Sequence, residues 1–130
     1  MNVTGFEEIG NLSLEIKNNR QRIIAILIDN LYLCVGKKKA ITSSKLRLKI
    51  KAELGIMVSS PQLRSLVRHI RISGILKLVL AGGKGYWRAQ TETEIKEYLD
   101  SLEERETQIR DLRNAIKNQF LERKKEKQSE

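Results

Sequence analysis

The segment from Val58 to Ala89 constrains the fold of this chain more than any other stretch. It opens with two serines and a proline, and no glycine follows until Gly74. Serine is a favoured N-cap and proline is tolerated in the first turn, so the segment predicts a helix over 61–73. Its inward stripe comprises Leu63, Leu66, Val67 and Ile70, which recur at helical spacing.

A β-hairpin is expected directly after this helix. Residues 76–80 alternate leucine with Lys77 and Val79, which is typical of a half-buried strand. The sequence Gly-Gly-Lys-Gly at 82–85 permits positive φ in the turn. Residues 85–89 then form the return strand. Tyr86 and Trp87 are adjacent and point to opposite faces of that strand, so we expect one ring to pack in the core.

An apolar helix is predicted upstream, over about residues 17–35. Its apolar residues cover more than one face, which indicates burial on more than one side. Gly36 and the three lysines after it are typical of a helix end, where glycine suits the C′ position and cations favour the dipole. A solvated cap and direct phosphate contact are both open for these lysines. Residues 40–42 are expected to form a short strand at the base of the hairpin.

Residues 45–54 have an ambiguous pattern. Apolar and basic residues alternate strictly from Lys45 to Lys51, which is a strand signature. A helix is favoured because hydroxyl residues that suit an N-cap precede the segment, good helix formers fill it, and Gly55 follows it. On this interpretation Leu48 lies off the apolar face.

A single long helix is predicted for the C-terminal part, over about residues 92–125. Thr91 and Glu94 fit a capping box, and neither glycine nor proline follows. Such a helix is about 50 Å long at 1.5 Å per residue. Apolar residues follow a heptad pattern, but Glu106 and Arg113 occupy two of its positions. The residues expected to form this oligomerisation seam are Ile95, Leu99, Leu102, Ile109, Ile116 and Phe120.

Positive charge is concentrated in the middle of the chain. The net charge of the 130 residues is +9. Residues 36–90 carry 13 basic side chains and one acidic side chain, Glu53, whereas residues 1–35 and 91–130 have net charges of −1 and −2. A surface that serves only solubility would mix the two signs. Concentrated positive charge is instead the electrostatic signature of phosphate binding.

The composition argues against several classes of protein. One Cys and one His exclude an internal disulfide and a structural zinc site, and no cofactor is expected. His69 stands alone and Cys34 lies in an apolar helix, so neither indicates catalysis, and we expect no enzyme activity. The longest apolar run is too short to span a membrane, and the N-terminus lacks signal-peptide features. We therefore expect a cytoplasmic protein, associated with the nucleoid when DNA-bound.

The ordered motifs resemble those of bacterial winged helix-turn-helix domains. The match comprises Leu54-Gly55-Ile56, Arg64 with Arg68, Ile70-Arg71 followed by Gly74, and Gly83-Lys84-Gly85-Tyr86. The pattern is similar to the N-terminal domain of the biotin-operon repressor and, more closely in layout, to small phage and mobile-element proteins with a long C-terminal helix. It implies a mainly α (α+β) fold with a small β-hairpin: a winged helix-turn-helix with an N-terminal helix and a long coiled-coil-like C-terminal helix. The expected divisions are 1–36 (lead-in and packing helix), 37–90 (winged domain) and 91–130 (oligomerisation helix with a charged tail).

The resemblance implies that residues 61–73 enter the major groove of double-stranded DNA. Arg64 and Arg68 lie one turn apart and are the best candidates for guanine contacts, because guanidinium binds guanine bidentately. Lys45, Lys49 and Lys84 are expected to contact phosphates, which position the protein without specifying sequence. Further expected contacts are Ser60, Gln62, Ser65 and Arg71.

Three functions are compatible with this sequence. The first is a phage or mobile-element type of transcriptional regulator that acts as a homodimer or higher homo-oligomer. The second is a replication or architectural accessory protein with little sequence preference. The third is a protein–protein interaction module that uses the winged fold, with the C-terminal helix holding a partner.

Overall fold

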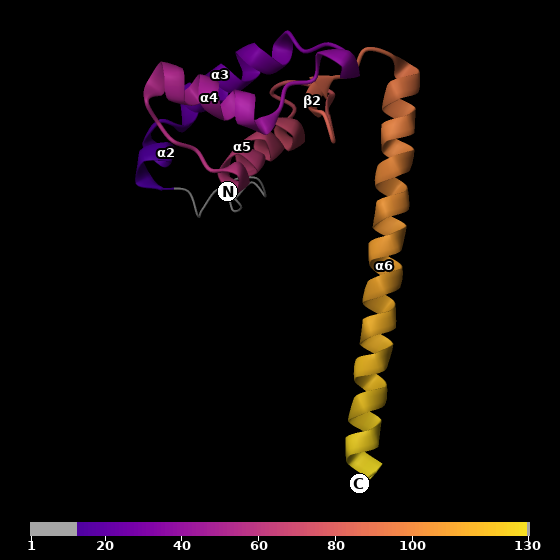
Figure 1. The fold of residues 1–130 in the computed structure, drawn as a ribbon. Coiled ribbons are helices and arrows are strands. Elements are labelled where there is room, and N and C mark those ends of the chain that lie inside the picture. The colour runs from indigo at the N-terminus through magenta and orange to yellow at the C-terminus, as the bar shows by residue number, and fades with distance from the viewer. Residues whose placement is uncertain (1–12, 130) are drawn as a thin grey trace. The chain divides into compact units, whose positions relative to one another are not determined.

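A computed structural model of the chain describes residues 13–129, and the predicted lead-in over residues 1–12 lies outside this range (Figure 1). The chain is mainly α-helical, with one β-hairpin and a long C-terminal helix, as predicted. Two compact units divide at Glu92 and Thr93, and the first is called the head unit below. The elements are α2 (Leu14–Asn18), α3 (Arg20–Tyr32), the 3₁₀ turn η2 (Lys37–Lys39), α4 (Ser43–Leu54), α5 (Ser60–Ser73), β1 (Val79–Gly82), β2 (Gly85–Arg88) and α6 (Glu92–Ser129).

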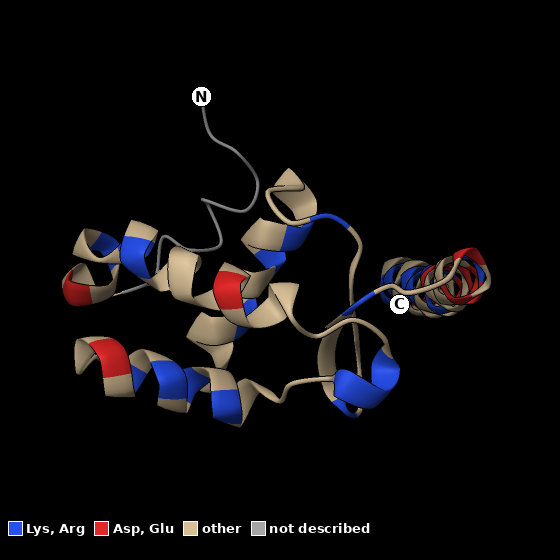
Figure 2. Cartoon of the chain, turned by 90° about the horizontal axis from the view of Figure 1, so that it is seen from above, with Lys and Arg blue, Asp and Glu red and all other residues tan. Residues whose placement is uncertain are grey.

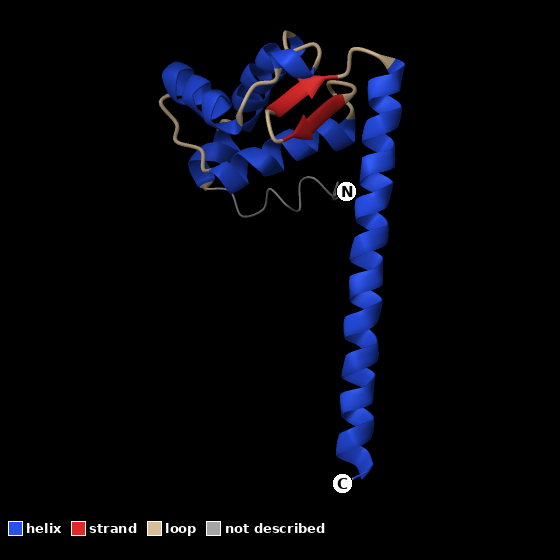
Figure 3. Ribbon diagram, turned by 45° about the vertical axis from the view of Figure 1, so that its right-hand side comes forward, coloured by secondary structure: helices blue, strands red, loops and turns tan. Residues whose placement is uncertain are grey.

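The core of the head unit lies between α3, α4, α5 and the hairpin (Figure 3). Each of the three helices contributes side chains that are completely buried, such as Leu27, Leu46 and Leu66. The predicted inward stripe of α5 is confirmed, because all four of its members are buried. Helix α3 contacts both other helices and β2, so the N-terminal helix is part of the same core.

The predicted single helix over 17–35 is wrong at both ends. Asn19 has non-helical angles (φ −109°, ψ 13°) and separates α2 from α3, and its side-chain amide donates to the Glu15 carbonyl at 2.9 Å. Asparagine competes in this way with the helical hydrogen bonds of its neighbours. Helix α3 ends at Tyr32, so Gly36 is not its C′ residue. Gly36 instead begins η2 with φ 88° and donates its N–H to the Arg88 carbonyl at 2.8 Å.

Helix α4 settles the ambiguous pattern of residues 45–54 in favour of a helix. The Thr42 hydroxyl accepts from the Lys45 N–H at 3.2 Å, and Gly55 ends the helix with φ 67°. Leu46 and Ile50 are buried, whereas Leu48 is 64% exposed. Apolar and basic residues alternate along this helix because Leu48, between the two buried residues, lies on its exposed face.

The hairpin is shorter than predicted at its first strand. Strand β1 begins at Val79, and Val79 and Leu80 are both buried. Leu78 lies before the strand with φ 60° and is exposed, so the expected alternation over residues 76–80 is wrong. The antiparallel register pairs Leu80 with Trp87 and Gly82 with Gly85 around a two-residue turn. The chain turns at Leu78 to enter the hairpin, and only then becomes extended.

The second edge of β2 pairs with the chain around η2. Ile41 and Tyr86 exchange two backbone hydrogen bonds of 2.9 Å, which form an isolated bridge in place of the strand predicted over 40–42. Gly85 has φ 113°, and a Cβ there would overlap the Ile41 carbonyl. This close approach therefore requires glycine. Trp87 is buried, which confirms the prediction that one of the two aromatic rings packs inside.

Helix α6 is continuous over 38 residues, about 57 Å at 1.5 Å per residue. It extends beyond the predicted end near residue 125. Most large apolar side chains along it are exposed, and Ile109 reaches 68% exposure. These apolar side chains form a stripe along α6 that is not buried in a core of the single chain.

Candidate nucleic-acid interface

Helices α4 and α5 are joined by a short turn of residues 55–59 and are followed by the hairpin. Ser59 fixes the start of α5 through a capping box with Gln62. The Ser59 hydroxyl accepts from the Gln62 N–H at 3.3 Å, and the Gln62 side-chain oxygen accepts from the Ser59 N–H at 2.8 Å. Two backbone donors at the helix start are thereby satisfied, and the direction in which α5 leaves the turn is set.

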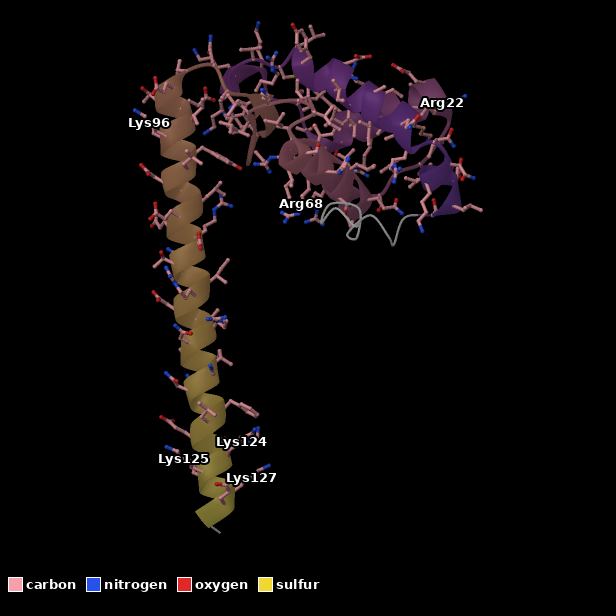
Figure 4. All side chains as sticks on the ribbon, turned by 180° about the vertical axis from the view of Figure 1, so that it is seen from behind. Arg22, Arg68, Lys96, Lys124, Lys125 and Lys127 are labelled. Atoms are coloured by element: carbon pink, nitrogen blue, oxygen red, sulfur yellow. The ribbon has the colours of Figure 1, made fainter. Side chains whose placement is uncertain are left out.

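The outer face of α5 carries the two arginines that the sequence pattern indicates. Arg64 and Arg68 are exposed and lie one turn apart. Together with Pro61 and Ser65 they line a shallow hollow of about 280 Å³. Figure 4 shows Arg68 on the side of α5 that faces away from α3. Burial of the opposite face leaves this basic face of α5 open to a ligand.

A larger hollow of about 430 Å³ lies where the starts of α4 and α5 meet the hairpin, and we call it the hydroxyl hollow. Its wall consists mainly of side chains with hydroxyl groups and of glycine residues. Arg64 belongs to this hollow as well as to the outer face of α5. Its lining residues are Thr42, Ser43, Ser44, Ser60, Arg64, Ala81, Gly82, Gly83, Gly85 and Tyr86.

The chemistry of the hydroxyl hollow suits an anion such as a phosphate. The N-terminal ends of α4 and α5 both contribute to its wall, and helix N-termini present partial positive charge and free N–H groups. The Arg64 guanidinium adds a full charge. Within the described part of the chain, the buried Ser43 hydroxyl oxygen has no hydrogen-bond partner.

The three predicted phosphate-binding lysines are all exposed but do not form one cluster. Lys45 lies in the first turn of α4, next to the hydroxyl hollow. Lys84 lies in the two-residue turn at the tip of the hairpin. Lys49 lies near the Cys34 thiol, as does Lys39 of η2, because both lower the pKa of that thiol. The basic surface therefore continues from α4 toward η2.

Two predicted contact residues have structural roles. Arg71 is half-buried, and its Nε donates to the Val79 carbonyl at 2.9 Å, which ties α5 to β1. Gln62 uses its side-chain oxygen in the capping box. Arg71 thus holds α5 against β1, and Gln62 holds the start of α5, while their predicted contacts with DNA stay a prediction. Ser60 lines the hydroxyl hollow, and Ser65 lines the outer face of α5.

Sequence reasoning misses the part that Thr42, Ser43 and Ser44 play in this surface. The sequence marks them only as candidate caps for α4, and Thr42 does cap that helix. Their position in the hydroxyl hollow follows from the packing of the hairpin against α4 and α5. The Ser59-x-x-Gln62 pattern, in contrast, can be recognised in the sequence as a capping box at the start of α5.

His69 and Cys34 both lie apart from the hydroxyl hollow, in the packed part of the head unit. Burial lowers the pKa of His69, and the nearby Arg20 charge lowers it further. His69 lies on the core side of α5 and is only 5% exposed. Burial raises the pKa of the Cys34 thiol, which is half-buried and donates to the Asn30 carbonyl at 3.2 Å. Among residues 13–129, no group of three or more His, Cys, Asp or Glu side chains could hold a metal ion.

Basic side chains dominate the head unit. Figure 2 shows Lys and Arg on its helices and turns and few acidic residues, whereas α6 carries both signs. In residues 13–90 the acidic residues are Glu15, Asp29 and Glu53, against 16 Lys and Arg. The positive charge expected from the sequence therefore lies on the unit that contains the hydroxyl hollow.

Comparisons with protein-family models, curated proteins and solved structures found no match for this chain. Among the helices of the described residues, none combines the length and the apolar character that a membrane span requires.

Proposed function

We propose that this protein binds double-stranded DNA through a winged helix-turn-helix and is not an enzyme. Helices α4 and α5 form the helix-turn-helix, and β1 and β2 form the wing. The observation that carries the proposal is the convergence of two helix N-termini, hydroxyl side chains and Arg64 on the hydroxyl hollow. A phosphate group is the ligand that such an arrangement suits best.

DNA would be bound by three adjoining parts of this surface. A backbone phosphate would occupy the hydroxyl hollow, and α5 would enter the major groove with Arg64 and Arg68 facing base edges. Lys84 at the wing tip would contact a neighbouring stretch of backbone. Lys45 and Lys49 would add phosphate contacts along α4. A protein of this kind would act in the cytoplasm, on the nucleoid.

We further propose that the protein is a regulator of the phage or mobile-element type and that α6 joins two copies. Paired heads would read two half-sites related by the symmetry of the dimer. The exposed apolar stripe of α6 supports association, since contiguous exposed apolar surface marks interaction sites.

Selection of bound duplexes from a random pool tests the proposal, with wild type compared with Arg64→Ala. Arg22→Ala is the matched control, because Arg22 is also exposed but lies on α3 (Figure 4). A regulator should enrich a defined sequence. Arg64→Ala should relax the preference at one position by about 1–3 kcal/mol, and Arg22→Ala should preserve it.

The outcomes separate the alternatives. Strong binding without enrichment would favour the accessory protein of low sequence specificity, whose affinity depends steeply on salt. Failure to bind any duplex at low salt would exclude the proposal and leave the protein-interaction module.

A further inference from the structure

The apolar stripe of α6 contains two charged residues that define how it can pair. In heptad terms Ile95, Leu102, Ile109 and Ile116 occupy position d, and the a positions are Leu99, Glu106, Arg113 and Phe120. Helix α6 is continuous through all of them, so the heptad pattern is not interrupted by a break. The charged pair lies in the middle of the stripe, with apolar residues at both ends.

Glu106 and Arg113 cannot neutralise each other within one helix. Side chains that are neighbours on a helix surface lie three or four residues apart, whereas these two lie seven apart, about 10.5 Å along the axis. Glu106 has Arg110 one turn further on, but Arg113 has no acidic residue three or four positions away, so a partner that covers the stripe is favoured when it supplies an acidic residue near Arg113.

A parallel, in-register pair of α6 helices would bring like charges together. Position a then faces the same residue of the second copy, so Glu106 would meet Glu106 and Arg113 would meet Arg113. Flanking positions g and e would also place Arg105 against Arg110. Charges taken out of water without opposite partners are strongly unfavourable.

An antiparallel pair avoids these clashes, and we propose that α6 forms one with a second copy of this chain. Ile95 then lies opposite Phe120 of the second copy, and Leu99 opposite Ile116, so that both ends of the pair are apolar. Arg113 of the second copy lies level with Leu102, only about 6 Å along the axis from Glu106. Each Glu106 thereby gains an arginine across the interface.

Flanking charged residues also meet in this register. Glu103 and Arg110 of the second copy lie within about 3 Å of the same level along the axis, and two-fold symmetry produces this ion pair twice. Lys96 and Lys117 of the second copy lie at the same spacing and repel each other, so the flanking positions contribute one attraction and one repulsion. The opposite charges of Glu106 and Arg113 therefore select a second copy in antiparallel orientation as the occupant of the stripe. The proposal rests on the self-association proposed above but does not depend on DNA binding.

Antiparallel pairing also separates the points at which the two α6 helices begin. The two Glu92 residues would lie about 46 Å apart along the helix axis, whereas a parallel pair would bring them together.

Disulfide crosslinking tests the orientation without DNA. Leu99→Cys and Ile116→Cys are made separately in a Cys34→Ser background, in which serine keeps the hydrogen-bond donor of the single native cysteine. We expect the mixture of the two variants to form a covalent dimer, because these positions face each other. Each variant alone should form none, because equivalent residues lie about 26 Å apart, well beyond the about 7 Å limit between Cα atoms.

Crosslinking within either single variant would overturn the proposal in favour of a parallel pair. A solution mass of 15.0 kDa at micromolar concentration would overturn it in favour of a monomer. If DNA binding persisted in that monomer, the proposed function would survive while this inference failed.

Charge exchange provides a second readout. Glu106→Arg should raise the dissociation constant of the dimer about tenfold, and adding Arg113→Glu should restore it, because the opposite charges again meet. In a parallel pair neither substitution removes the like-charge contact, so a single variant as tight as wild type would contradict the antiparallel arrangement.

Discussion

Helices α5 and α6 are both amphipathic, but only α5 finds a core within one chain. Leu63, Leu66, Val67 and Ile70 of α5 are completely buried in the head unit. Along α6 the corresponding side chains, such as Ile109 and Ile116, are more than half exposed. The difference shows that the head folds around its own apolar residues, whereas the apolar residues of α6 remain exposed in the single chain.

The two helices also differ in the kind of surface that they leave exposed. Once the apolar face of α5 is buried, its remaining surface is basic and directed to solvent. In α6 the polar surface carries mixed charge, and its apolar stripe is what remains unpartnered. We therefore propose an anionic ligand for α5 and a second copy of the helix for α6.

The largest expected effect comes from truncating the same kind of side chain in each region. Leu66→Ala should lower the free energy of unfolding of the head by about 2–5 kcal/mol, because it creates a cavity in a packed core. Ile116→Ala should leave head unfolding unchanged and weaken only association. Urea unfolding at several protein concentrations measures both, and a comparable loss of head stability in Ile116→Ala would break the comparison.

Gly85→Ala should have the next largest effect on the head. The added Cβ would overlap the Ile41 carbonyl, and φ 113° is strained for alanine. Strain of this kind costs about 1–3 kcal/mol. Gly83→Ala is the matched control, since open space surrounds that position. Equal thermal stability of the two variants would contradict the close approach of β2 to Ile41.

Loss of the α5 cap should have a smaller effect. Ser59→Ala removes the acceptor for the Gln62 N–H and should destabilise the head by about 1 kcal/mol, whereas Ser59→Asp should keep most of the stability. The measurement is the midpoint of thermal unfolding. An unchanged midpoint in Ser59→Ala would show that the capping box does not stabilise the start of α5.

The smallest expected effect is a pH dependence that arises from one group. His69 is the only histidine, and burial together with Arg20 lowers its pKa from the ordinary 6.5. As the pH falls below about 6.5, the unfolded chain takes up this proton before the folded one, so stability should decrease. His69→Gln should remove this dependence, as measured by urea unfolding between about pH 7 and pH 5. An unchanged slope in the variant would assign the effect to other groups.

The elements that have clear start and stop residues, or no helix breaker, are predictable from the sequence. Helix α5 lies between a serine–proline start and Gly74, and the long helix has no breaker, so the predicted bounds of both agree with the structure within a few residues. Errors occur where local and tertiary preferences compete. Asn19 interrupts an apolar pattern that continues on both sides, and Leu78 adopts positive φ although its spacing suggests a strand.

The candidate site is only partly predictable. Arg64 and Arg68 follow from helical periodicity, because the buried stripe of α5 fixes which residues face outward. The hydroxyl hollow depends on three segments that are distant in sequence, among them Ser43 and Gly83. No local pattern announces that the hairpin packs against the starts of α4 and α5. The structural role of Arg71 is hidden for the same reason, since its bond to Val79 is a tertiary contact.

We propose that the head, and not α6, binds duplex DNA. Two double variants remove the same charge from the two regions: Arg64→Ala/Arg68→Ala on α5, and Lys125→Ala/Lys127→Ala on α6 (Figure 4). Anisotropy titrations of a labelled duplex over a series of salt concentrations measure affinity and its salt dependence. We predict that the α5 variant binds at least about tenfold more weakly and that its salt slope decreases by about 1 for each phosphate that is no longer neutralised, while the α6 variant stays close to wild type. Equal weakening in both variants, or weakening in the α6 variant alone, would contradict binding of DNA by the head.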